Sequence, residues 1–422
     1  MDDRSETPAA PPADPQGSAA VIDRGSHPVS RRNISSAAIK VLYRIKNHGH
    51  LAYLAGGGVR DLLLNRTPKD FDIATDATPE ELRAMFNNSR IIGRRFRLVH
   101  VLFRGEIIEV STFRAGVRAE DAEQHSDHAF RTEDGVIVRD NVWGTAAQDA
   151  LRRDFTVNAL FYNIADFSII DYVGGLEDID RRTIRVIGDP TDRFTEDPVR
   201  MIRAIRFAAT LGFDIEETAR RSIGELGETM QAASPARLYE EVRKLFLCGN
   251  GERVFELLSE LDFIEPLFPE LGEWLKDPEG EAGVHWIRNT FRQLDRWVAA
   301  GLKVDTPLMF ALLFGAYHER RAETLCREES LSPAAALQQA THDHILQLGE
   351  RIAIPKNDRA RIARIMALQP RFRKTTPSRV HKLERNPQFL DAWLYFKFAA
   401  KTFDRDGKEV TFWEKRHRGE GG

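Results

Sequence analysis

The sequence predicts an α+β protein in which a mixed α/β head is followed by an all-α neck and body. Short β-type apolar runs alternate with helical periodicity between residues 33 and 187. Beyond Pro198 the strand signals end, and amphipathic helical patterns follow one another. The 422 residues are 42% hydrophobic and 30% charged, which is ordinary for a folded protein with several domains.

Four segments are expected. Residues 1–32 are rich in Pro, Ala and charge and have no apolar periodicity, so they predict a disordered tail. The catalytic head spans 33–187, the helical neck 188–270 and the helical body 271–422. In the neck and body, helices are expected at 199–211, 236–246, 254–261, 308–317, 333–352 and 359–368.

Within the head, the elements follow from apolar periodicity and turn residues. A helix capped by Asn33 closes near His48, and the run 51–55 reads as a strand that enters a glycine turn. Arg104 and Gly105 predict a hairpin. The remaining elements are strands at 71–74, 98–103, 107–113, 160–164 and 169–172, and helices at 79–86 and 146–154.

Composition excludes several classes of protein. The net charge of −3 excludes a globally basic nucleic-acid binder, so any polyanion must meet a local basic surface. Cys248 and Cys326 are far apart, which argues against a disulfide framework or a zinc ribbon and fits a cytoplasmic protein. No apolar run approaches about 20 residues, so neither a transmembrane helix nor a signal peptide is expected.

Two carboxylates carry the main chemical signal. The period of two in a strand places Asp70 and Asp72 on one face, while Phe71 points to the core. Carboxylates so placed bind a hard divalent metal that is shared with substrate phosphates. The pair predicts metal-dependent phosphoryl or nucleotidyl transfer. The alternative is a solvated turn or strand edge, which is what an isolated Asp-x-Asp more often forms.

The glycines upstream strengthen this interpretation. Gly57 and Gly58 allow backbone amides to approach a phosphate at the start of a helix near Val59, and Arg60 adds a mobile cation. The interval from Gly58 to the carboxylates fits a turn, a helix and a return strand. This path brings the glycine amides and the carboxylates to neighbouring strand ends.

Residues 54–72 resemble the signature of class II nucleotidyltransferases, the group that holds bacterial poly(A) polymerases and tRNA CCA-adding enzymes. Four further matches follow downstream: Glu109 in IIEVSTFR, Asp154 in RRDFTVNAL, DYVGGLEDI from Asp171, and EDPVRMIRAIRF from Glu196. The resemblance is strong over residues 50–270 and loose beyond. Residues 92–101 and 139–144 resemble the poly(A) polymerase branch.

The resemblance implies roles for the acidic residues. Asp70 and Asp72 would hold Mg²⁺ or Mn²⁺, and Asp154 would be the third acidic residue of the active site. Glu109 would support the metal site or pair with an arginine. Asn158 would face the ribose if the segment after Asp154 is helical.

The resemblance also implies how the nucleotide is bound. Arg153, with its neighbour Arg152, is suited to triphosphate oxygens or to a structural ion pair. Asp197 is expected to cap a helix whose first residue is Pro198. Together with Arg200 and Arg203, Asp197 would form the template for the incoming base; the alternative is a capped helix with ordinary ion pairs.

A basic run lies near the C-terminus. Between residues 351 and 382 there are ten Lys or Arg and one acidic residue. Arg371, Arg373 and Lys374 are expected to contact RNA phosphates, unless the run is a solvated face. The motif His342-Asp343-His344 is expected to lie on a helix surface.

These interpretations converge on a polynucleotide adenylyltransferase that adds AMP from ATP to RNA 3′ ends, in polyadenylation linked to mRNA processing and decay. The alternative in the same class is a tRNA CCA-adding enzyme. A catalytically inactive RNA-binding module is the alternative from another class, and the complete carboxylate set argues against it.

Overall fold

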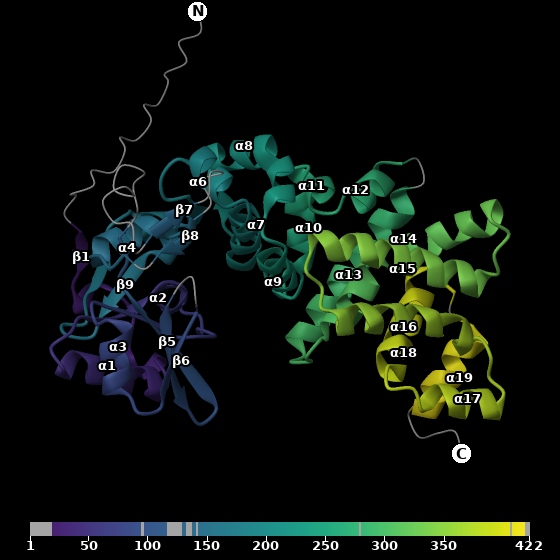
Figure 1. Cartoon of the computed structure of the whole chain (residues 1–422), viewed down its shortest axis with the longest axis horizontal. Helices are drawn as coiled ribbons and strands as arrows, with labels where there is room; N and C mark the ends of the chain where they lie inside the picture. Colours follow the sequence, from purple (N-terminus) through teal and green to yellow (C-terminus); the bar gives the residue numbers. More distant parts are fainter. Residues whose placement is uncertain are drawn as a thin grey trace, which may run out of the picture. The chain divides into compact units, whose positions relative to one another are not determined.

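The structure is a computed structural model that describes residues 19–93, 97–115, 129–131, 137–140, 142–277, 280–405 and 407–417 (Figure 1). The chain divides into two compact units, one of Met1–Asp197 with Phe213–Ser222 and one of Pro198–Gly212 with Ile223–Gly422. The predicted α+β class is confirmed. The expected head lies in the first unit, while the expected neck and body largely share the second unit.

A mixed eight-stranded sheet forms the centre of the first unit. Its strand order is β1-β10-β9-β2-β3-β6-β5-β4, in which β3 and β6 are parallel and the other neighbours antiparallel. The strands are β1 (Ala20–Ile22), β2 (Ala52–Ala55), β3 (Asp72–Thr75), β4 (Ser89–Ile92), β5 (Leu98–Phe103), β6 (Glu106–Thr112), β9 (Leu160–Asn163) and β10 (Ile169–Asp171). The predicted hairpin joins β5 to β6 through Gly105, whose φ is 86°.

Two short ribbons accompany the sheet. β7 (Ala129–Arg131) pairs with β8 (Ile137–Asp140), and β11 (Thr183–Ile184) pairs in parallel with β12 (Asp214–Ile215). Sequence patterns did not indicate these four strands, nor β1 and β4. The segments that resemble poly(A) polymerases are described only in part, because residues 94–96 and 141 lie outside the described residues.

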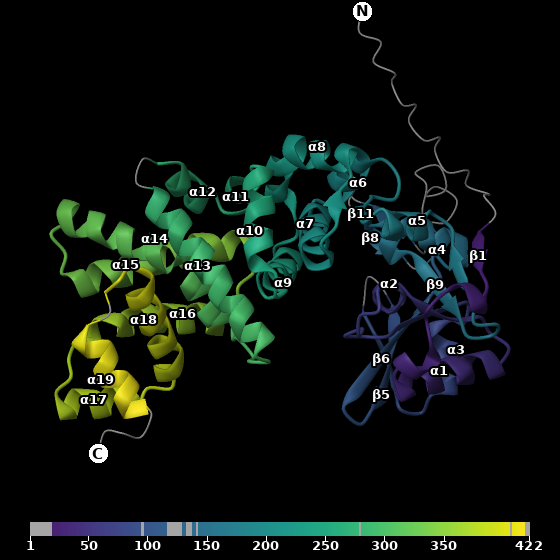
Figure 2. The ribbon, with the colours of Figure 1, turned by 180° about the vertical axis from the view of Figure 1, so that it is seen from behind.

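Helices cover both faces of the sheet. On one face, α1 (Ser36–Asn47) contacts β2, β3 and β6, and α3 (Pro79–Met85) contacts β4 and β5. Figure 1 and Figure 2 show α1 and α3 together beside the strands. On the other face, α4 (Ala146–Arg152) joins an aromatic core with Tyr53, Phe113 and Phe161. Asp72 lies two residues before Ala74 of that core, so strand periodicity places it on the same face.

Residues 19–32 correct the expectation of a disordered tail. β1 pairs with β10, and His27 Nε2 lies 2.9 Å from the carbonyl oxygen of Phe167. The Arg31 guanidinium lies 4.3 Å from the centroid of the Phe167 ring. The segment is ordered because strand pairing satisfies its backbone groups and these contacts anchor it. Residues 1–18 of the predicted tail lie outside the described residues.

The remaining helices belong to both units. The first unit also contains α2 (Gly57–Leu63), α5 (Gly175–Asp180), α6 (Pro190–Glu196) and 3-10 turns at Arg24–Ser26, Arg31–Asn33 and Thr156–Asn158. Helix α8 (Glu217–Leu226) begins in the first unit and ends in the second.

The described residues of the second unit are otherwise helical. They form α7 (Val199–Leu211), a 3-10 turn Gly227–Ala232, α9 (Pro235–Phe246), α10 (Gly251–Glu260), α11 (Ile264–Leu267), α12 (Pro269–Lys276), α13 (Gly280–Ala299), α14 (Thr306–Glu328), α15 (Pro333–Arg351), α16 (Lys356–Phe372), α17 (Pro377–Glu384), α18 (Phe389–Thr402) and α19 (Lys408–His417). The predicted neck and body helices are confirmed, and α14 extends well beyond its predicted end. None of the described helices is long and apolar enough to cross a membrane.

The prediction that the motif lies on a helix surface is correct for His342 and Asp343, which are exposed, and wrong for His344. His344 is buried between α14 and α15, where its Nδ1 lies 2.9 Å from Nε2 of the fully buried His318. Burial lowers the pKa of His344 to about 4 and that of His318 well below 6.5. The pair is therefore a neutral part of the core at physiological pH.

Candidate active site

Strand register brings the predicted carboxylates to one end of the sheet. Ala55, the last residue of β2, pairs with Asp72, the first residue of β3. Asp72 also lies opposite Glu109 of the parallel strand β6. The predicted path of strand, turn, helix and return strand is confirmed. Asp70 is exposed like Asp72, but it precedes β3, so strand periodicity does not set its position.

Negative charge concentrates around Asp72. Although the side chain reaches solvent, partial loss of hydration and then the charges of Glu109 and Asp70 raise its pKa from 3.8 to about 6, while Arg153 acts in the opposite direction. Glu109 Oε2 lies 3.4 Å from His100 Nε2, and the charge of Glu109 also interacts with that of Arg114, so the alternative role in pairing with an arginine stays open. A divalent cation at these carboxylates would relieve their repulsion.

The donor set fits a hard divalent cation, because carboxylate oxygens are the ligands that Mg²⁺ and Mn²⁺ prefer. Among the described residues, however, no three His, Cys, Asp or Glu side chains are arranged to bind one metal ion. A common role of Asp70, Asp72 and Glu109 as ligands thus stays a prediction.

The glycine turn lies directly beside Arg153. Gly56 has a φ of 68°, and a Cβ built at this residue would lie 2.9 Å from Arg153 Nη1. A larger residue would therefore be strained and would displace the guanidinium. Gly57 and Gly58 open α2, where their N–H groups have no acceptor within the helix. The turn presents two backbone donors and a cation in one place.

Arg60 is not the mobile cation that the sequence suggested. It is 7% exposed, and it donates from Nη1 to Asn158 Oδ1 and from Nη2 to Asp61 Oδ1 at 2.7 Å. Asn158 Nδ2 in turn donates to Asp154 Oδ1 at 3.2 Å. A buried polar chain thus runs from the first turn of α2 to the third predicted acidic residue.

The expected helical relation between Asp154 and Asn158 is also wrong. α4 ends at Arg152, Arg153 and Phe155 have extended backbone, and Asn158 lies in a separate 3-10 turn. Asn158 is 7% exposed and is occupied by Arg60 and Asp154. These contacts make it a residue that positions Asp154, and a contact to the ribose stays a prediction.

Arg153 is held from several sides. Arg153 Nη2 donates a hydrogen bond to Asp149, one turn earlier in α4, at 3.0 Å. Arg153 Nη1 donates another to the Asn158 carbonyl oxygen at 3.2 Å. Arg193 donates to the carbonyl oxygens of Arg152 and Arg153 at 2.8 and 2.9 Å. Arg193 is itself paired with Glu196 at 2.9 Å. Sequence analysis missed Asp149 and Arg193, although Asp149 and Arg153 have the i,i+4 spacing of a helical ion pair.

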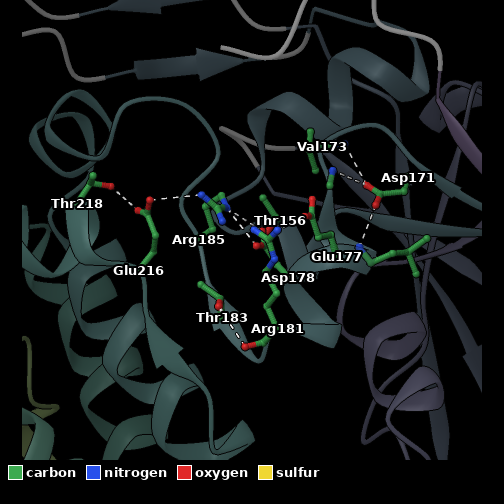
Figure 3. A network of polar contacts seen from close by, with 12 residues as sticks. Thr156, Asp171, Val173, Glu177, Asp178, Arg181, Thr183, Arg185, Glu216 and Thr218 are labelled. Carbon is green, nitrogen blue, oxygen red and sulfur yellow. Dashed lines mark hydrogen bonds and ion pairs between the residues drawn. The ribbon is translucent and has the colours of Figure 1, made fainter. Parts of the chain in front are cut away.

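The matched segment from Asp171 supports the turn that carries Asn158. The Asp178 carboxylate accepts a hydrogen bond from Thr156 Oγ1 at 2.6 Å and another from Arg185 Nε at 3.1 Å. Arg185 in turn forms an ion pair with Glu216 (Figure 3). Figure 3 also shows the Asp171 carboxylate turned toward backbone N–H groups, among them that of Val173 at 3.0 Å. Asp171 therefore holds the backbone of this segment in place, and Asp178 holds the side chains of Thr156 and Arg185.

The predicted base-recognition residues are divided between the units. Asp197 belongs to the first unit and ends α6, whereas Pro198 is the N-cap of α7 without a side-chain hydrogen bond. The prediction that Asp197 caps this helix is therefore wrong. Arg200 and Arg203 are one turn apart on α7 in the second unit.

Glu241 of α9 orients Arg203. It is 6% exposed, accepts hydrogen bonds from Arg203 Nη1 at 3.1 Å and Lys244 Nζ at 3.0 Å, and forms an ion pair with Arg206 Nη2 at 3.3 Å. Burial opposes ionisation of Glu241, but the three cations outweigh it and lower the pKa below 4.5. Sequence analysis missed this residue, because it is 38 positions from Arg203 in the chain.

The basic run is partly structural. Arg351 pairs with Glu270 at 2.5 Å, and Arg361 pairs with Asp305 at 2.7 Å. The three cations predicted to contact RNA are different, since they are exposed around the C-terminal end of α16: Arg371, Arg373 and Lys374.

A carboxylate pair, a glycine turn at a helix start and an arginine beside it, on a mixed sheet followed by a helical unit, define a nucleotidyltransferase. Residues 52–185 match the family described as "Poly A polymerase head domain". Residues 212–275 match "Probable RNA and SrmB- binding site of polymerase A", and residues 329–420 match "Polymerase A arginine-rich C-terminus".

Similar proteins agree with these matches. The chain is 39% identical over 381 residues to poly(A) polymerase I of Salmonella typhimurium, which covers 90% of this chain and 82% of that protein. It therefore belongs to the poly(A) polymerase family. A CCA-adding enzyme of Lactobacillus gasseri is 37% identical, but over only 55% of either chain. The crystal structure of the Bacillus stearothermophilus CCA-adding enzyme with CTP is 26% identical, with a TM-score of 0.61 over 92% of this chain and 82% of that chain.

Proposed function

We propose that this protein transfers AMP from ATP to the 3′ hydroxyl of RNA and releases pyrophosphate. The observation that supports this proposal most strongly is the extent of the similarity. The match to poly(A) polymerase I covers 90% of the chain, and the C-terminal residues also match the arginine-rich family. CCA-adding relatives match at nearly the same identity over little more than half of the chain. The longer match therefore favours polyadenylation over CCA addition.

The triphosphate would bind at the glycine turn. The N–H groups of Gly57 and Gly58 supply neutral donors and Arg153 supplies charge, and both interact favourably with phosphate oxygens. Asp149 and the Asn158 carbonyl fix the Arg153 guanidinium before the nucleotide arrives. This preorganisation lowers the cost of ordering the charged groups during the reaction.

In the reaction, the RNA 3′ oxygen loses its proton and bonds to the α-phosphorus, and the bond from that phosphorus to the β-phosphate oxygen breaks. Asp70 and Asp72, supported by Glu109, would hold Mg²⁺ or Mn²⁺. A bound divalent metal activates the attacking oxygen and stabilises the leaving pyrophosphate. Asp154, which is held by the hydrogen bond from Asn158, would lie where the site meets the sugar and the metal.

Base and RNA contacts complete the proposal. Asp197, Arg200 and Arg203 offer acceptors and donors for the Watson-Crick edge of adenine, with Glu241 orienting Arg203. Arg371, Arg373 and Lys374 would bind RNA phosphates. The free thiols Cys248 and Cys326 fit the reducing cytoplasm as the compartment.

The direct test uses labelled ATP and an RNA primer with Mg²⁺ or Mn²⁺. Asp72→Ala should reduce AMP incorporation by on the order of 10³ or more, because a metal-binding carboxylate is lost. The fold should survive, because Asp72 is exposed. Asp76→Ala is the matched control, since Asp76 is an exposed aspartate at the other end of β3. Substantial transfer by a folded Asp72→Ala or Asp70→Ala protein would exclude this site.

A further inference from the structure

A basic groove lies between two helices of the second unit, outside the predicted basic run. Its volume is about 600 Å³, and α13 and α18 form its walls. Its basic lining residues are His285, Arg292, Arg296, Lys397 and Lys401, against one carboxylate, Asp404. The whole chain carries a net charge of −3, so this concentration of cations is local. The α13 wall lies between the segments matched by the second and third families.

Helical spacing explains how the cations converge. His285, Arg292 and Arg296 are separated by seven and four residues, which places them on one face of α13. Lys397 and Lys401 are four residues apart on α18. Two helix faces thus contribute cations to the same groove.

Aromatic packing holds the two walls together. Trp286 of α13 is fully buried. Its ring centroid lies 4.9 Å from that of Phe398 and 5.3 Å from that of Phe403, on which it stacks. His285 Nε2 also lies 3.3 Å from the carbonyl oxygen of Thr402. The groove is therefore built on a packed interface rather than on two independent surfaces.

Not all of these charges are neutralised by the protein. Arg292 pairs with Glu252 at 2.6 Å and Lys397 with Glu414 at 2.6 Å. Among the described residues, no ion pair is recorded for Arg296 or Lys401, and both side chains are exposed. Trp297, half-buried, adds an aromatic surface to the lining. Sites for single-stranded nucleic acid combine two features: cations that follow the phosphate backbone, and aromatic side chains on which bases stack.

We infer that this groove binds the phosphate backbone of the RNA substrate, with Arg296 and Lys401 as phosphate contacts. The inference rests on the proposed function, which supplies RNA as the polyanion. It adds an RNA contact on α13 to those proposed at the end of α16. Contact with the backbone predicts little dependence on base sequence.

The test is RNA binding rather than catalysis, measured by fluorescence anisotropy with labelled oligo(A) and oligo(U) over a range of salt concentrations. The double variant Arg296→Glu, Lys401→Glu should bind both RNAs roughly tenfold more weakly. Its slope of log affinity against log salt should be smaller by about 1.4, because each phosphate contact on single strands contributes about 0.7. Arg296→Gln, Lys401→Gln should show the same change of slope.

The matched control is Lys303→Glu, Arg385→Glu, which changes the net charge equally at two exposed residues outside the groove. Equal weakening in the control, or weaker binding with an unchanged salt slope, would overturn the inference. Binding needs no transfer, so failure of the proposed function would appear separately, as RNA binding without AMP incorporation. Circular dichroism checks the fold of each variant.

Discussion

Replacing Asn158 by Ala tests whether the buried polar chain positions the active site. The change removes the acceptor for Arg60 Nη1 and the donor for Asp154 Oδ1, while the backbone carbonyl that holds Arg153 remains. A hydrogen bond to a charged group contributes about 1.5–3 kcal/mol. Two such bonds are lost, but Asp61 still holds Arg60, so we expect a loss near the lower end of the summed range, about 3 kcal/mol.

That loss corresponds to about 6–12 °C in the melting temperature of the first unit, which calorimetry measures. Asp154 loses one fixed donor, so kcat should fall by about 10- to 100-fold, as for other residues that orient ligands.

Asn158→Asp separates the contact with Arg60 from the contact with Asp154. It keeps an acceptor for Arg60 but replaces the donor to Asp154 by a like charge. Activity should therefore fall as in Asn158→Ala, with Arg60 still held. Full activity in Asn158→Asp would refute the reasoning, as would unchanged kcat in a destabilised Asn158→Ala.

Two further predictions concern the second unit. Reversing Arg371, Arg373 and Lys374 to Glu should raise KM for RNA and flatten its salt dependence, with little change in KM for ATP; steady-state kinetics at several salt concentrations measure both, and equal losses would mean that these residues are structural. Glu241→Gln should cost about 2–3 kcal/mol at neutral pH, because Arg203 and Arg206 lose a charged partner. The folded-state pKa of Glu241 is lowered, so its contribution is complete above the unfolded value near 4.5 and is lost as pH falls through the folded value. Calorimetry should accordingly find the difference between wild type and variant shrinking below pH 4.5, and a constant difference down to pH 3 would contradict the assignment.

Local patterns predicted the parts of the fold that local physics decides. The glycine turn and the strand carrying Asp72 could be located because turn chemistry and the period of two are properties of neighbouring residues. Most long helices were found for the same reason. β1 and the 19–32 segment were missed, because a three-residue strand is stabilised by its partner β10 and carries little periodicity of its own.

The residues that orient the site are held by distant contacts. Arg60 looked like a free cation, yet its partner Asn158 is 98 positions away. The same holds for Glu241 and Arg203. Sequence spacing alone indicates a residue's chemistry, whereas its burial and partners depend on long-range packing. His344 was misjudged for this reason, since its buried partner His318 lies on another helix.

The most direct test of the central claim is the sequence of the product. The protein is given ATP and CTP together with either an unstructured oligo(A) primer or a tRNA that lacks its last three nucleotides. A base template that pairs one polar edge leaves buried groups unsatisfied with the wrong base, so ATP should be selected. We predict extension of oligo(A) by many A residues with no fixed stop. Ordered addition of two C and one A to the tRNA, with little extension of oligo(A), would contradict the account and identify a CCA-adding enzyme.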